Sequence, residues 1–148
     1  MGPLQKSKSR KRNLAGCLMM TGDLWALAAA MLLVVVQLTL SSVLTLRQLG
    51  GAWVAGSRDE AREVGGVSGR FVRAHRNLLE IFPQFLAALF LVHAAHATGS
   101  LSTIGAWMFV IARLFYVPAY AFAPAGIRPI CWLAAQFGIF IIVADIFV

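Results

Sequence analysis

The sequence predicts an all-helical integral membrane protein, built as a bundle of four transmembrane helices. Hydrophobic residues make up 59% of the 148 residues, charged residues only 13%, and the mean hydropathy is +0.77. Soluble domains are about 45–50% apolar and about 25% charged. Because a bilayer-spanning helix needs about 20 apolar residues, the chain has enough for about four. This composition excludes a disordered chain, a disulfide-rich scaffold and an ordinary soluble enzyme.

The first two predicted helices cover residues 24–46 and 70–98. Asp23 precedes the first apolar run as an acid suited to the N-terminus of a helix. That run is too long for the core of a signal peptide, and no small-residue cleavage pattern follows it. The glycine-rich segment 47–69 is predicted to be a loop of about twenty residues, and loops of that length are usually functional or disordered.

Two further helices are predicted, at residues 101–123 and from residue 127 to the C-terminus. Pro83 and Pro118 are predicted to bend the second and third helices, because proline removes a backbone hydrogen bond. Short turns precede the third and fourth helices, and short connections place antiparallel helices side by side. The four apolar segments are therefore predicted to form one bundle.

The net charge of +7 is attributed to membrane topology and to a site, not to nucleic-acid binding. Five of the thirteen basic residues lie in the first twelve positions, and most of the others flank or enter apolar segments. The chain is thus divided into a basic N-terminal tail, 1–23, and a four-helix domain, 24–148. Because Met19 and Met20 precede the apolar domain directly, we expect the tail to reflect a mis-assigned start. Basic residues are equally numerous on both sides, which leaves the membrane orientation undecided.

Six polar side chains form one stripe along the start of the second predicted helix. At about 100° per residue, five of them fall within about 60° of Arg73. The stripe consists of Arg70, Arg73, Arg76, Asn77, Glu80 and Gln84. Charged groups inside a membrane are costly and mark a site or a pathway, although arginines near a helix end also reach lipid head groups. Six polar residues on one face exceed that need, so the stripe is a candidate site.

A second polar face is predicted on the third helix, where Arg113, Tyr116 and Tyr120 have i, i+3, i+7 spacing. Together the two faces set four arginines against one carboxylate, Glu80, which Arg76 is placed to pair with at i, i+4. The surplus positive charge calls for an anionic ligand, a carboxylate or a phosphate. Glu80 suits a ligand ammonium, and the hydroxyl donors and cations suit a thiolate.

The histidine and cysteine residues are predicted to have structural roles and to bind no metal. His93 and His96 have i, i+3 spacing, but no carboxylate or cysteine lies near them in the sequence, so no metal site is predicted. Cys17 and Cys131 lie far apart and show no metal-ligand spacing. Cys131 is interpreted as a small buried hydrophobic residue. Asp145 is expected at the membrane interface.

Residues 70–80, Arg-Phe-Val-Arg-Ala-His-Arg-Asn-Leu-Leu-Glu, resemble the signature of the MAPEG family, the membrane-associated proteins of eicosanoid and glutathione metabolism. The resemblance continues at Pro83 and in segments 112–120 and 126–128. Segment 58–60, Arg-Asp-Glu, looks like the corresponding loop of bacterial members. The resemblance is specific because two motifs on different helices occur in the right order.

The resemblance implies a homotrimer in a bacterial inner membrane, with glutathione bound as a cosubstrate between neighbouring subunits. The positions that match the family's glutathione contacts are Arg47, Arg73, Arg76, Asn77, Glu80, Tyr120 and Arg128. Arg47 is implied to act across the subunit interface. Arg113, Tyr116 and Tyr120 are implied to be the catalytic residues that stabilise the thiolate.

Two departures from the family pattern narrow the implied activity. Tyr116 stands where some members have histidine, and Pro129 stands where the prostaglandin-making member has a serine that activates the thiol. The resemblance therefore favours a glutathione transferase or peroxidase acting on a lipid-soluble electrophile. Two alternatives stay open: a non-catalytic membrane protein that binds an anionic lipid or metabolite, and a small four-helix transporter.

Overall fold

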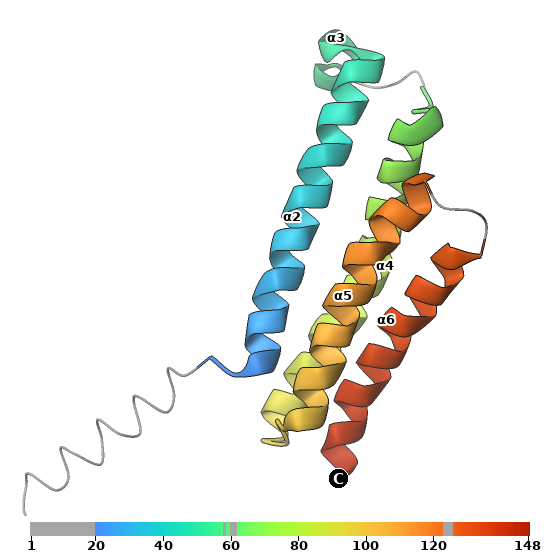
Figure 1. Cartoon of the computed structure of the whole chain (residues 1–148). Helices are drawn as coiled ribbons and strands as arrows, with labels where there is room; N and C mark the ends of the chain where they lie inside the picture. The colour runs from blue at the N-terminus through green and yellow to red at the C-terminus, as the bar shows by residue number, and fades with distance from the viewer. Residues whose placement is uncertain (1–19, 58, 60–61, 123–125) are drawn as a thin grey trace, which may run out of the picture.

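The computed structural model describes residues 20–57, 59, 62–122 and 126–148, and the regular secondary structure of these residues is helical. The long helices run alternately up and down (Figure 1): α2 (Gly22–Leu49), α4 (Gly66–Ala94), α5 (Ser100–Phe122) and α6 (Ile127–Ala144). Two short helices complete them: α3 (Gly51–Ala55) after α2 and the 3₁₀ helix η1 (Asp145–Phe147) after α6. All four long segments are long and apolar enough to span a membrane, which confirms the predicted four-helix bundle.

The predicted loop between the first two helices is wrong in its extent. α2 continues to Leu49, α3 follows it, and α4 begins at Gly66, four residues earlier than predicted. Gly50 adopts φ +82°, a conformation that glycine tolerates, and its backbone N–H donates to the Leu46 carbonyl at 2.9 Å. This turn ends α2 and allows the chain to start a new short helix at once. Most of the tail 1–23, together with Arg58 and Glu60, lies outside the described residues.

α4 ends at Ala94, four residues before the predicted boundary, because the chain forms a Schellman-type cap there. His96 lies in the left-handed region with φ +53°. Its backbone N–H donates to the His93 carbonyl at 3.1 Å, and the Ala97 N–H donates to the Val92 carbonyl at 3.0 Å. α4 and α5 continue through Pro83 and Pro118, and the bends expected at these residues stay predictions.

The helices pack through stacked aromatic rings and through glycine. The buried rings of Phe85 on α4 and Phe109 on α5 are stacked with centroids 4.0 Å apart. Gly105 and Gly138 bring α5 and α6 into close contact, because a Cβ on either glycine would lie 2.6 Å from the carbonyl oxygen of the other. Small residues of this kind let membrane helices approach closely. The two contacts fix the register of α5 against both neighbours.

Two carboxylates hold the helices together at the end of the bundle where α2 and α5 begin. Asp23 is fully buried in the first turn of α2, and its Oδ2 lies 2.8 Å from Nε2 of His93 on α4. Asp145 Oδ2 accepts a hydrogen bond from the backbone N–H of Ser102 at 2.8 Å, which satisfies a donor in the first turn of α5. Both contacts are structural, and His93 has a carboxylate partner that is distant in the sequence.

We predict that His96→Gly raises the free energy of unfolding in detergent by about 1 kcal/mol, because glycine removes the steric cost of the left-handed conformation. The unfolding midpoint of the purified protein measures this change. Ala95→Gly is the matched control: Ala95 lies next to His96 but has right-handed helical φ and ψ, so glycine there lowers the midpoint. Equal shifts of both variants in the same direction contradict the prediction.

Candidate functional site

The candidate residues of three helices gather at one end of the bundle. The start of α4, the end of α5 and the start of α6 lie together there, next to the corner between α2 and α3 (Figure 1). Arg70 and Arg73 lie in the first turns of α4, and Arg128 lies in the first turn of α6. Arg113 and Tyr116 lie in the second half of α5 and point into the bundle.

Arg113 is the most buried charged group of the site. Its side chain is enclosed, with 1% of the residue surface exposed, and its Nη1 donates to Asn77 Oδ1 at 2.9 Å. Its Nε and Nη2 atoms are buried and have no hydrogen-bond partner in the described part of the chain. Buried polar groups are otherwise nearly always hydrogen-bonded, and a buried charge without an opposite charge is costly. The two remaining donors therefore suit an anionic or strongly polar ligand.

Aromatic and cationic side chains continue from Arg113 toward α6. The guanidinium carbon of Arg113 lies 5.0 Å from the centroid of the Tyr116 ring, and the Tyr116 and Tyr120 rings lie 5.6 Å apart. The guanidinium carbon of Arg128 lies 4.8 Å from the centroid of the Tyr120 ring. Cation–π contacts of this kind orient both partners. The structure thus joins the three candidate residues of α5 to Arg128 in one continuous row.

Asn77 connects the polar stripe of α4 to this row. The stripe residues other than Asn77 are exposed on the outside of α4, and Asn77 is half-buried at its edge. Its amide Nδ2 donates to Glu80 Oε2 at 3.3 Å, while its Oδ1 accepts the hydrogen bond from Arg113. One amide therefore links an exposed carboxylate to a buried guanidinium.

The predicted ion pair between Arg76 and Glu80 is wrong. Among the residues that the structure describes, Glu80 is bonded to Asn77 and makes no ion pair with Arg76. Both side chains are exposed at the surface of the chain, where such a pair contributes little free energy. The neighbouring amide, one turn away, satisfies the carboxylate instead, and this leaves the Arg76 guanidinium available for a ligand.

Arg70 and Arg47 have different surroundings from the rest of the set. Arg70 Nη1 donates to the Ala121 carbonyl at 2.8 Å, so this residue ties the start of α4 to the last turn of α5. Its role is at least partly structural, which sequence spacing did not reveal. Arg47 lies exposed at the end of α2, and within the described residues it makes no ion pair or hydrogen bond with the other candidates.

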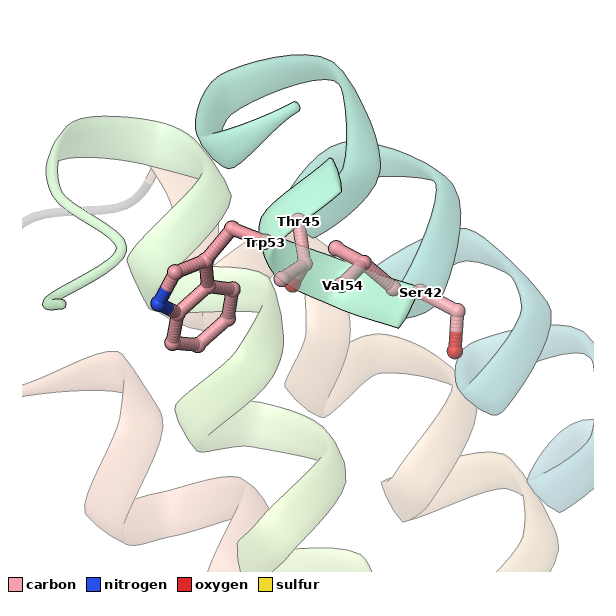
Figure 2. A pocket seen from close by; sticks show the side chains of 4 residues that line it. All are labelled: Ser42, Thr45, Trp53 and Val54. Carbon is pink, nitrogen blue, oxygen red and sulfur yellow. The ribbon is translucent and has the colours of Figure 1, made fainter. Parts of the chain in front are cut away.

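The described part of the chain also has hollows outside the arginine cluster. The first has a volume of about 200 Å³ and is formed where α3 folds beside α2; Figure 2 shows the side chains that line it: Ser42, Thr45, Trp53 and Val54. The second is an apolar groove of about 540 Å³ over α5 and α6, lined by Thr103, Ile104, Trp107, Met108, Ile111, Ala112 and Ala134. The first hollow is not predictable from the sequence, because nothing in the predicted loop 47–69 indicates α3.

The four membrane-spanning helices define an integral, multi-pass membrane protein, and its polar site lies on three of these helices. The family profile of MAPEG matches residues 24–148. The chain therefore belongs to the MAPEG family, which is generally associated with glutathione. No curated protein and no solved structure matches the chain. In the described residues, no group of three or more histidine, cysteine, aspartate or glutamate side chains is arranged to hold a metal ion.

We predict that Asn77→Ala lowers the free energy of unfolding by about 1–3 kcal/mol, because a third donor of the buried Arg113 guanidinium loses its partner. Asn77→Asp is the matched control, since a carboxylate keeps the acceptor and adds an opposite charge. Unfolding midpoints in detergent compare the two variants with the wild-type protein. A midpoint of Asn77→Ala equal to that of the wild type contradicts the prediction.

Proposed function

We propose that the protein binds glutathione on the polar face of α4, α5 and α6 and acts as a glutathione transferase or peroxidase on apolar electrophiles. One observation carries the proposal: Arg113 is a buried guanidinium with two donors that have no partner among the described residues, beside Tyr116. Glutathione offers two carboxylates, an ammonium and a thiol. The polar face offers arginines, one carboxylate and phenol hydroxyls, which match these groups in kind.

The exposed arginines of α4 bind the carboxylates in this proposal. Arg73 and Arg76 lie on the same stripe, and a guanidinium holds a carboxylate with two parallel hydrogen bonds. Arg128, stacked on Tyr120, is placed to bind the other carboxylate. Glu80 binds the ammonium, with its carboxylate already oriented by Asn77.

The thiol then lies toward α5, where Arg113 and the two tyrosines stabilise the thiolate. Positive charge and hydrogen-bond donors next to a thiol favour its ionised form, which is the nucleophile. The thiolate attacks the electrophilic carbon, a carbon–sulfur bond forms and the leaving group departs. With a lipid hydroperoxide, the thiolate attacks the terminal oxygen and an alcohol leaves. A second glutathione then attacks the oxidised sulfur of the first, and glutathione disulfide and water form.

The exposed charge on α4 supports an assembly in which neighbouring copies cover this face, and we propose that the assembly is a homotrimer. Arg73, Arg76 and Glu80 lie on the outer surface of a membrane-spanning helix. A charge that faces lipid is costly, and the cost reaches about 2.5–3.5 kcal/mol for an arginine at the centre of a bilayer. Neighbouring copies that cover this face remove the cost, and Arg47 of a neighbouring copy completes the glutathione site. The apolar substrate arrives from the bilayer, which we assign to a bacterial inner membrane.

Calorimetry in detergent tests the binding site. We expect glutathione to bind the wild-type protein and Arg73→Ala to weaken the affinity roughly tenfold, the loss of one charge-assisted contact. Arg73→Lys is the matched control and falls between the two, because it keeps the charge but loses the planar fork. No binding by the wild type, or the same affinity for Arg73→Ala, contradicts the proposal.

Turnover of a dinitrohalobenzene tests the proposed glutathione transferase activity separately from binding. We expect glutathione-dependent conjugation by the wild type, and a roughly 100-fold lower kcat for Tyr116→Phe with little change in glutathione affinity, if the hydroxyl acts on the developing thiolate. Binding without turnover contradicts the enzyme and favours a non-catalytic protein that binds an anionic metabolite or lipid. Ion flux in proteoliposomes that Glu80→Gln abolishes also contradicts it and favours a transporter.

A further inference from the structure

Cys131 lies on the buried stripe of α6 that packs against α5. Ala135, Gly138 and Ile142 of this stripe are buried, and Cys131 stands one turn before them at i, i+4, i+7, i+11 spacing. Its thiol is free and the residue is half-buried. The position of Cys131 relative to α5 is therefore set by the same packing that joins the two helices.

The register of α5 and α6 places Cys131 within about one helical turn of Arg113 along the bundle axis. A Cβ on Gly138 would lie 3.0 Å from the Phe109 backbone nitrogen, so these two residues are opposite each other. Arg113 is four residues after Phe109, and Cys131 is seven residues before Gly138. Because α5 and α6 are antiparallel, Arg113 and Cys131 are displaced from this level toward the same end of the bundle. At 1.5 Å per residue, Arg113 is displaced by about 6 Å and Cys131 by about 10 Å.

The Cys131 thiol interacts electrostatically with the Arg113 guanidinium. Tyr116 and Glu80 interact with the same guanidinium. Glu80 is exposed and bonded to Asn77, whereas Arg113 is enclosed and keeps two donors without a partner in the described residues. Cysteines next to a guanidinium and partly open to solvent are the ones that react with disulfides. Cys131 is half-buried, so the sequence-based prediction that it is a buried small hydrophobic residue is wrong in its burial.

We propose that Cys131 is a modification site, at which glutathione disulfide forms a mixed disulfide with the protein. The inference rests on the proposed glutathione site, because the arginines of α4 bind the carboxylates of the incoming disulfide. The Cys131 thiolate attacks one sulfur of glutathione disulfide, a protein–glutathione disulfide bond forms and the original disulfide bond breaks. One glutathione leaves as a thiolate and takes up the proton that Cys131 released. Glutathione disulfide is the oxidant, and no other reagent is required.

The adduct changes what the site can bind. A glutathione group attached to Cys131 lies beside Arg113 and occupies the face that the free ligand uses. The modified protein therefore loses noncovalent glutathione binding until a thiol reductant removes the adduct. This makes the site sensitive to the ratio of oxidised to reduced glutathione.

Peptide-resolved mass spectrometry tests the modification on the full-length protein in detergent. In Cys17→Ser, Cys131 is the one remaining cysteine, and it is treated with glutathione disulfide or with hydroxyethyl disulfide, which is small and uncharged. We expect the glutathione adduct on the α6 peptide, formed roughly tenfold faster than the hydroxyethyl adduct. Cys131→Ser is the matched control and gives no adduct on that peptide. In the wild-type chain the same analysis separates Cys131 from Cys17, so the test does not depend on either variant.

The outcomes separate this inference from the proposed function. No reaction of Cys131 with either disulfide overturns the modification site, while glutathione binding by calorimetry stays intact. Equal rates with both disulfides also overturn it, because the arginines then give no help, and calorimetry shows whether the glutathione site fails too. A faster reaction with glutathione disulfide that Arg73→Ala slows, with the hydroxyethyl rate unchanged, supports it.

Discussion

The burial of one positive charge is the constraint on which the rest of this structure depends. Arg113 sits inside a bundle of membrane-spanning helices with one neutral hydrogen-bond partner, Asn77, and two donors without a partner in the described residues. A buried charge that no carboxylate balances is costly in a medium of low dielectric constant. The cost is offset by cation–π contact with Tyr116 and Phe109 and, in our proposal, by an anionic ligand. The Glu80 carboxylate, which interacts electrostatically with Arg113, is exposed and is available to a ligand.

The two ends of the bundle differ in their charged side chains. At one end, carboxylates are already satisfied: Asp23 by His93, and Asp145 by the backbone of α5. At the other end, arginines of α4 and α6 are exposed without carboxylate partners in the described chain. The close approach of Gly105 and Gly138 locks α5 against α6 between these ends. One end therefore holds the helices together, and the other presents positive charge.

Much of the fold and of the polar face is predictable from the sequence, because long apolar runs and helical periodicity are local signals. The stripe on α4 and the common face of Arg113, Tyr116 and Tyr120 follow from spacing alone. Spacing along one helix does not reveal hydrogen-bond partners. The contacts of Asp23 with His93 and of Arg70 with the Ala121 carbonyl join distant segments. Glu80, which is expected from spacing to pair with Arg76, is hydrogen-bonded to the Asn77 amide instead. α3 escaped prediction because five residues carry no periodic pattern.

The state of the bound thiol tests the role of Arg113 most directly. Ultraviolet difference spectroscopy at neutral pH detects the absorption band of a thiolate. The double substitution Cys17→Ser and Cys131→Ser ensures that the band does not come from a cysteine of the protein. If the buried guanidinium stabilises the ligand's thiolate, adding glutathione to the protein produces the band in proportion to the occupied sites, and S-methylglutathione produces none. Saturable binding of glutathione with no thiolate band would contradict the claim that this charge activates the thiol.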